Sequence, residues 1–326
     1  MSIAIGIGGG SPASGGGGGG GQVTIGLSSS TPDYNGSLTI TATPSGISPT
    51  VYTFQISDSE GGIETTQQAS NVLVWTVNKV GTVTISVVAT QGGVEVGATA
   101  TATVTDPLNY ATKLVDYDMR NNITLVSDLI DVVGDSSGNG HDVTATTSAN
   151  RFYYNSYTDI AETGTNGDLR STTSNPLAGV ADFSMFIKCH KQAPVGSNQR
   201  VICFGTSASG LGVGLLSFGG GNLTIGTNNF AQYQSTNVNT INGEPFAVIK
   251  NGTNPYDIYA DGVLTTPTGS AGSPPATIAT GNGIYLATQN GSFKLNGSIQ
   301  RIVIFDSVLT ATQVAAVNAR IKQLHP

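Results

Sequence analysis

Paired carboxylates are the residues to look for first, because two of them at the right distance can hydrolyse a glycosidic bond. Retaining glycosidases place their two carboxyl groups about 5–5.5 Å apart. On a strand, such a pair needs two acidic residues on one face, in a Glu-x-Asp or Glu-x-x-x-Glu pattern. The sequence has five glutamates, of which only the first two are close, flanking a Gly-Gly turn: Glu60, Glu64, Glu95, Glu162 and Glu244. The sequence therefore predicts that the chain is not an enzyme, and no catalytic residue is assigned.

The three histidines offer no better case for catalysis. His141, His190 and His325 share no consistent spacing with a serine or with a carboxylate that would indicate a nucleophilic site. We expect their side chains to be solvated or packed.

Hard oxygen ligands gather in one glycine-rich segment. Asp135, Asn139 and Asp142 could bind calcium, although the segment lacks the ligand density of an EF-hand loop. Short Asp and Asn side chains also stabilise turns by accepting hydrogen bonds from their own backbone. The turn is the favoured interpretation, so neither a metal nor any other cofactor is assigned.

Aromatic residues are concentrated in a polar setting at Arg151-Phe-Tyr-Tyr-Asn-Ser-Tyr157. If Tyr153 and Tyr157 are exposed, their rings could stack on sugar rings. Strand alternation would equally place Phe152 and Tyr154 in a core. Core packing is favoured for the segment, and Tyr153 and Tyr157 are the candidate ligand-binding residues.

The C-terminal part of the chain predicts a buried strand followed by a capped helix. Ile299 to Phe305 form a nearly continuous apolar run rich in β-branched residues, as in a strand covered on both faces. Thr310 and Gln313 have the spacing of a capping box, so a helix should begin there. An apolar stripe at helical spacing follows: Val314, Val317, Ile321 and Leu324.

Residues 23–106 predict a small sandwich of about seven short strands. Alternation with period 2 recurs in six segments separated by turn signals: 23–25, 37–43, 51–56, 72–77, 81–88 and 94–104. Seven strands in roughly 85 residues is the size of an immunoglobulin-like sandwich. Trp75 is expected in its core, and Asp106-Pro107 marks its end.

Residues 1–22 form a glycine-rich tail. Such a segment is a flexible coil in water, and ordering glycine costs more entropy than ordering any other residue, so only a partner would hold it in place. Ile3, Ile5 and Ile7 alternate with small residues and could add as a strand to a partner's sheet edge. The tail is therefore predicted to be an anchor, with a simple linker as the alternative.

Composition and charge exclude several kinds of partner. The net charge is −7 and the pI about 4.8, so there is no basic surface to neutralise the phosphates of a nucleic acid. No apolar run is long enough to span a membrane. The first residues lack the positive flank and apolar region of a secretory signal. Cys189 and Cys203 could be cross-strand neighbours, but buried free thiols are favoured for a chain made in a reducing compartment.

Several segments resemble known domain families. Gly81–Gly93 is similar to the late strands of bacterial and phage immunoglobulin-like domains. Asp135–Thr144 resembles an early segment of laminin-G-like domains, with Val143 in place of the usual glycine, and Asp182–Cys189 resembles their aromatic strand. Ala247–Leu264 resembles their hairpin, and with the final strand and helix these segments occur in the order found in that family.

The resemblances imply an all-β chain. It would consist of a Gly-rich N-terminal tail at 1–22, an Ig-like β-sandwich at 23–106, and a concanavalin A-like (laminin-G-like) β-sandwich jelly roll at 107–326 with a short C-terminal helix. Within the last domain, Asp261-Gly262 should form a tight two-residue hairpin turn.

Domains of an extracellular type conflict with the absence of an export signal. A virus particle that assembles in the host cytoplasm explains this conflict most simply. We expect a non-enzymatic bacteriophage virion protein at the particle surface: a capsid decoration, head fibre or tail-associated adhesin. Its tail would dock on other virion proteins, and its sandwich would contact host-surface glycans. Neither nucleic acid nor membrane insertion is expected, and a homo-oligomer is left open. The alternatives are a cell-surface or secreted carbohydrate-binding lectin and, third, a polysaccharide hydrolase.

Overall fold

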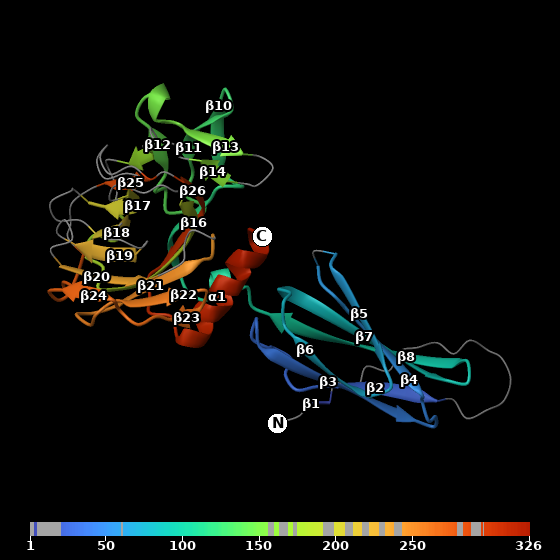
Figure 1. Ribbon diagram of the computed structural model, residues 1–326. Coiled ribbons are helices and arrows are strands. Elements are labelled where there is room, and N and C mark those ends of the chain that lie inside the picture. Colours follow the sequence, from blue (N-terminus) through green and yellow to red (C-terminus); the bar gives the residue numbers. More distant parts are fainter. Residues whose placement is uncertain are drawn as a thin grey trace. The chain divides into compact units, whose positions relative to one another are not determined.

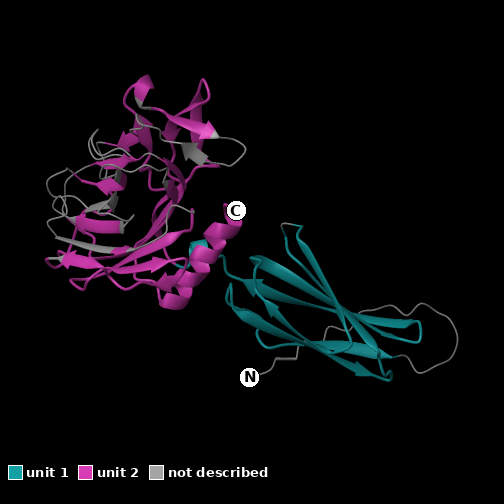
Figure 2. Ribbon diagram, in the orientation of Figure 1, with its two compact units in different colours: residues 1–110 teal, residues 111–326 magenta. Residues whose placement is uncertain are grey.

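The computed structural model divides the chain into two compact units, residues 1–110 and residues 111–326 (Figure 2). It describes residues 3–4, 21–59, 61–155, 160–162, 169–171, 175–191, 199–205, 211–216, 222–227, 232–237, 243–278, 283–287, 295 and 297–326. Near the end of unit 1 lies a 3-10 turn, Pro107–Asn109, whose start is capped by the Asp106 carboxylate, which accepts from Leu108 N–H.

Unit 1 is a sandwich of two antiparallel sheets (Figure 1). The first sheet has the order β1-β2-β3-β6, with bounds Ile3–Ala4, Gln22–Leu27, Ser37–Ser45 and Val72–Thr76. The second has the order β5-β4-β7-β8, with bounds Ile63–Gln68, Val51–Ser57, Gly81–Gln91 and Val94–Val104. The seven strands β2–β8 confirm the predicted immunoglobulin-like sandwich.

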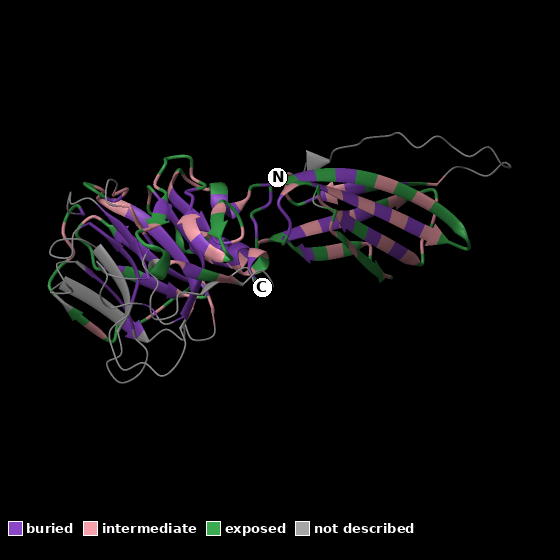
Figure 3. Ribbon diagram, turned by 90° about the horizontal axis from the view of Figure 1, so that it is seen from above, coloured by how far each residue is buried: buried purple, intermediate pink, exposed green. Residues whose placement is uncertain are grey.

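Alternation along these strands builds the core of unit 1. Buried residues alternate with intermediate or exposed ones along β4 and β7, and Phe54 and Val83 are completely buried. Figure 3 shows strands with this alternation as bands of different burial colour. Trp75 is buried as predicted, and its indole N–H donates to Glu64 Oε2 over 3.0 Å. Because Trp75 lies on β6 and Glu64 on β5, this bond links an edge strand of one sheet to an edge strand of the other. Glu64 therefore has a structural contact, and its neighbour Glu60 lies outside the described residues.

In its described residues, unit 2 contains strands β9 to β26 and one α-helix. The first nine strands are Lys113–Asp118, Ile123–Val126, Leu129–Val133, Val143–Ala145, Phe152–Asn155, Ile160–Glu162, Leu169–Ser171, Asp182–Lys191 and Gln199–Phe204. The next nine are Leu211–Leu216, Asn222–Thr227, Gln232–Asn237, Phe246–Asn251, Asp257–Ala260, Val263–Leu264, Gly269–Ala271, Ile284–Leu286 and Gly297–Phe305. A 3-10 turn covers Ser148–Asn150, and helix α1 covers Ala311–Leu324.

Antiparallel pairing arranges these strands in two runs. One run has the order β9-β26-β16-β21-β22-β23. The other has the order β10-β11-β12-β15-β25-β17-β18-β19-β20-β24. Strand β13 pairs with β11, and its partner β14 pairs with β26, so these two strands join the runs. Buried residues of both runs form one core, which defines a second sandwich.

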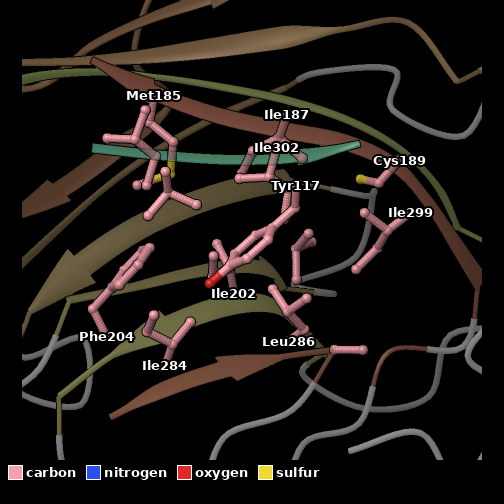
Figure 4. Packing of buried hydrophobic residues seen from close by; sticks show 14 of the residues in the cluster. Tyr117, Met185, Ile187, Cys189, Ile202, Phe204, Ile284, Leu286, Ile299 and Ile302 are labelled. Carbon is pink, nitrogen blue, oxygen red and sulfur yellow. The ribbon is translucent and has the colours of Figure 1, made fainter. Parts of the chain in front are cut away.

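The core of unit 2 is dense with aromatic and β-branched side chains. Tyr117 of β9 lies between Ile302 of β26 and Ile202 of β17 (Figure 4). The two cysteines are buried thiols that form no disulfide: Cys189 lies opposite Ile299, and Cys203 lies opposite Tyr285. They are thus not cross-strand partners of each other, and the favoured expectation of buried thiols agrees with the structure.

The C-terminal strand and helix follow the sequence prediction closely. All nine residues of β26 are buried. The hydroxyl of Thr310 accepts from Gln313 N–H, and the Gln313 side chain accepts from Thr310 N–H, which completes the capping box. Val314, Val317 and Ile321 are buried, so α1 packs its apolar stripe inward. The fold class is therefore confirmed: an all-β chain of two sandwiches with one C-terminal helix.

The tight turn at Asp261-Gly262 is confirmed and packs against α1. Both residues have positive φ, 48° and 79°, as a type I′ turn requires. A Cβ on Gly262 would lie 3.0 Å from Ala315 Cα in the helix. The turn thus needs glycine for two reasons, backbone conformation and space.

Substituting Gly262→Ala should destabilise unit 2 more than Gly179→Ala does. Gly179 has a similar φ of 77°, but nothing lies within 4 Å of its added Cβ. Both variants suffer backbone strain of about 1–2 kcal/mol, and only G262A adds ~1–3 kcal/mol of overpacking. Calorimetric unfolding would measure the difference, while fluorescence of Trp75, the sole tryptophan, reports unit 1 as an internal reference. Equal losses in the two variants would contradict the close packing of this turn on α1.

Candidate functional site

The predicted ligand-binding residue Tyr153 lies on the surface of unit 2. Strand β13 alternates as both sequence interpretations required: Phe152 is completely buried in the core, and Tyr154 is partly buried against it. Tyr153, between them, points outward with 64% of its surface exposed. The other candidate, Tyr157, lies outside the described residues.

Tyr153 ends a row of apolar side chains that crosses three strands. Leu129 of β11 is the register partner of Tyr153, and Val126 of β10 is the register partner of Leu129. Directly opposite residues of antiparallel strands lie on the same face, about 5 Å apart. Val126 is 39% exposed and Leu129 half-buried, so the row is open to solvent. Ser127 and Asp128, both with positive φ, form the tight turn that brings β10 and β11 together.

A charged pair borders this row. The Arg151 side chain, which precedes β13, donates from Nε to Asp131 Oδ1 over 2.7 Å. Both side chains are partly exposed. Asp131 is the extra residue of a β-bulge between β10 and β11, where the register shifts. We call the five residues Val126, Leu129, Asp131, Arg151 and Tyr153 the Tyr153 surface.

The Tyr153 surface combines the two kinds of group that hold a sugar ring. An exposed aromatic face packs against the apolar C–H face of a pyranose, and a carboxylate and guanidinium beside it can bond hydroxyl groups. The sequence indicated Tyr153 through the aromatic run. It did not indicate Val126 or Leu129, which reach Tyr153 only through strand register.

The Asp135–Asp142 segment is a hydrogen-bonded turn. Asp135 Oδ1 accepts from Asp116 N–H and Ser137 N–H, both at 2.9 Å, while Oδ2 accepts from the Ser137 hydroxyl at 2.7 Å and from His141 N–H at 3.2 Å. Four bonds occupy the acceptor sites of this carboxylate. Asp135 is therefore engaged in holding the loop against β9.

The other two candidate calcium ligands have similar contacts. Asp142 Oδ1 accepts from Asp135 N–H at 2.7 Å, and the Asn139 amide donates to Lys113 O at 2.8 Å. Within the described part of the chain, no group of three or more His, Cys, Asp or Glu side chains could hold a metal ion. The contacts agree with the favoured turn interpretation.

An acidic pair that the search for glutamates missed lies on β9. Asp116 and Asp118 are two positions apart, so they share one face of the strand, and both are buried. Arg301 of β26 bonds both of them: its Nη2 lies 2.9 Å from Asp116 Oδ1, and its Nη1 lies 3.0 Å from Asp118 Oδ2. Lys113 Nζ adds a contact of 2.8 Å to Asp116 Oδ2. The spacing Asp116-Tyr-Asp118 was the available signal in the sequence.

This acidic pair is suited to structure rather than to proton transfer. Burial favours the protonated form of Asp118, but the positive charge of Arg301 and hydrogen bonds from Arg120 outweigh it and lower its pKa below the ordinary value. A carboxylate held ionised in this way cannot supply a proton at neutral pH.

The end of helix α1 closes over the acidic pair. The Arg120 guanidinium donates to Leu324 O, and the Lys188 ammonium donates to His325 O. The His325 ring is buried, with Nε2 3.5 Å from Asp118 Oδ1. Burial, aided by the three cations Arg120, Arg301 and Lys188, lowers the pKa of His325 to about 3 despite the attraction of Asp118.

Unit 2 should lose stability as the pH falls from about 6.5 toward 3. In the unfolded chain His325 takes up a proton near pH 6.5, whereas the folded protein resists it, so acid favours unfolding in this window. The slope approaches about 1.4 kcal/mol per pH unit. Thermal unfolding between pH 7 and pH 4 measures it.

The variant His325→Gln should flatten this slope, because glutamine does not titrate. The control variant Thr312→Ser, at an exposed position of α1 that carries no titrating group, should keep the wild-type slope. A wild-type slope in H325Q would show that another group governs the acid sensitivity.

The predicted anchor residues are only partly described. Ile3 and Ala4 form β1, which pairs with β2 of the same unit in the register Ile3↔Leu27 and Ala4↔Gly26. Ile5 and Ile7 lie outside the described residues. Among the residues that are described, no helix is long and apolar enough to cross a membrane.

Solved structures with a similar arrangement of strands come from several carbohydrate-active enzymes. Domain 4 of AbnA, a GH43 extracellular arabinanase from Geobacillus stearothermophilus in complex with arabinotriose, matches 64% of this chain and 98% of its own, with 14% identity and a TM-score of 0.43. A GH54 α-L-arabinofuranosidase matches 60% of this chain and 51% of its own, with 12% identity and a TM-score of 0.40.

The Trypanosoma rangeli sialidase in complex with 2,3-difluorosialic acid matches 91% of this chain and 53% of its own, with 8% identity and a TM-score of 0.40. The present chain thus spans about half the length of the arabinofuranosidase and sialidase chains. These likenesses concern the β-sandwich fold alone. No family model and no curated protein sequence matches the chain.

Proposed function

We propose that this chain is a non-enzymatic surface protein of a bacteriophage virion that binds host-surface glycans through the Tyr153 surface. The observation that carries the binding role is the position of Tyr153, which is largely exposed although its neighbours Phe152 and Tyr154 pack inward. Burying such a ring would normally stabilise the fold, so its exposure suits a ligand that supplies the missing contact.

The virion role has two supports in the sequence. The glycine-rich tail carries an apolar tip that suits strand addition, and Gly81–Gly93 resembles phage immunoglobulin-like domains. In this proposal the tail docks on a capsid or tail protein, unit 1 is a spacer, and unit 2 contacts the host. A lectin of a cell surface would use the same binding surface but would not need the tail.

A binding role without catalysis fits the contacts of the acidic side chains. Asp116 and Asp118 are bonded to Arg301, and Asp131 on the Tyr153 surface is bonded to Arg151. A retaining glycosidase needs two carboxyl groups free to face a sugar from about 5 Å apart. These described aspartates are instead occupied by cations.

The variant Tyr153→Ala should lose glycan binding. Removing an aromatic platform that stacks on a ligand costs about 1–2 kcal/mol, so affinity for any glycan selected from an array should fall about tenfold or more. Titration calorimetry on the full chain measures the change. Val263→Ala, another exposed apolar residue of unit 2, is the matched control and should bind like the wild type. Equal affinities for Y153A and the wild type would contradict the assignment of this surface.

Deleting residues 1–22 should abolish incorporation into phage particles while both sandwiches stay folded. The physical reason is that the tail supplies the apolar strand for docking, which would exchange the pairing of Ile3–Ala4 with β2 for a partner's sheet edge. Quantitative immunoblots of purified particles measure incorporation, and circular dichroism checks the fold. A triple variant with Ser at Ile3, Ile5 and Ile7 keeps the tail length and should also fail to incorporate. Normal incorporation of the deleted form would disprove the anchor and leave the cell-surface lectin as the better account.

A further inference from the structure

The residue types of the Tyr153 surface restrict the class of sugar that it can bind. On the β11 side of the tyrosine, the aliphatic residues Leu129 and Val126 follow in direct register. On its other side, the register partner of Tyr153 is the acidic residue Glu162 of β14. On the basis of the proposed function, we infer that this surface selects neutral sugars that carry a methyl group, such as 6-deoxyhexoses, over the same sugars with a hydroxymethyl group.

The size of the row suits a short piece of glycan. Neighbouring strands lie about 4.8 Å apart, so the three side chains on β10, β11 and β13 span roughly 10 Å. That length matches one or two pyranose rings. A stable protein–protein contact needs about 20–30 residues on each side, which far exceeds this patch. A small ligand is therefore the occupant that the area favours.

The aliphatic part of the row discriminates between a methyl and a hydroxymethyl group. The Val126 and Leu129 side chains have no hydrogen-bonding atom, so a hydroxyl placed over them would lose water without gaining a partner. A methyl group in the same place buries apolar area against both side chains. The row consequently favours the deoxy sugar of a matched pair.

The charges around the row disfavour an acidic sugar. The cationic residue of the Tyr153 surface is Arg151. Its Nε donates to Asp131, which leaves its charge largely compensated. Asp128 adds an exposed carboxylate at the adjacent turn, and the whole chain carries a net charge of −7. A carboxylated sugar would meet repulsion, whereas a neutral sugar would not.

Two pairs of probes test the selectivity on the full chain. The methyl α-glycosides of L-rhamnose and L-mannose differ only by one oxygen at C6, and those of L-fucose and L-galactose differ in the same way. NMR titration should show about tenfold tighter binding of a deoxy sugar than of its hydroxylated counterpart. N-Acetylneuraminic acid should show no saturable binding.

A matched pair of variants assigns the preference to the row. Val126→Thr adds a hydroxyl at nearly constant shape and should lower the deoxy-to-hydroxylated affinity ratio to about two. Val94→Thr, at an exposed valine of unit 1, should leave the ratio unchanged.

The outcomes separate this inference from the proposed function. If both members of a pair bind equally and Tyr153→Ala abolishes both, the selectivity is disproved while glycan binding stands. If neither pair binds but Tyr153→Ala removes binding to other glycans on an array, the selectivity is again disproved. A deoxy preference that persists in Y153A would overturn the site itself.

Discussion

The structure of unit 2 depends on the ion pairs that compensate a buried positive charge on strand β26. All nine residues of this strand are buried, and one of them is Arg301. An unpaired buried guanidinium would cost several kcal/mol, but Asp116 and Asp118 accept its hydrogen bonds from the neighbouring strand β9. Arg301 and Asp116 are 185 positions apart in the sequence, so this cluster joins the first strand of the unit to its last.

The same strand determines where the candidate binding surface lies. β26 pairs with β14 through Ser298, β14 pairs with β13, and β13 carries Tyr153 opposite Leu129 of β11. Burial of one face fixes the pairing register of each strand, because a shift of one residue would turn Tyr153 into the core and Phe152 toward solvent. The exposure of the Tyr153 ring thus follows from the pairing that begins at the buried strand β26. The binding surface therefore lies on paired strands of the sandwich.

Local signals made the C-terminal end of the chain and one hairpin turn predictable. The capping box at Thr310, the tight turn at Asp261-Gly262 and the doubly covered run at β26 each depend on residues close in sequence. Long-range register was not accessible in the same way. The register partners of Tyr153 are separated from it in sequence by a hairpin and a bulge. The Asp-x-Asp spacing of β9 indicates an ion-paired cluster only once Arg301 is known to lie on the neighbouring strand.

Mapping of a bound glycan onto the backbone tests the central claim most directly. In amide-resolved NMR spectra of the full chain, addition of a glycan that binds should shift the signals of residues 126–131 and 151–154 and leave those of unit 1 unchanged. Shifts confined to other loops of unit 2, or to unit 1, with residues 126–131 and 151–154 unaffected, would contradict the assignment of binding to the Tyr153 surface.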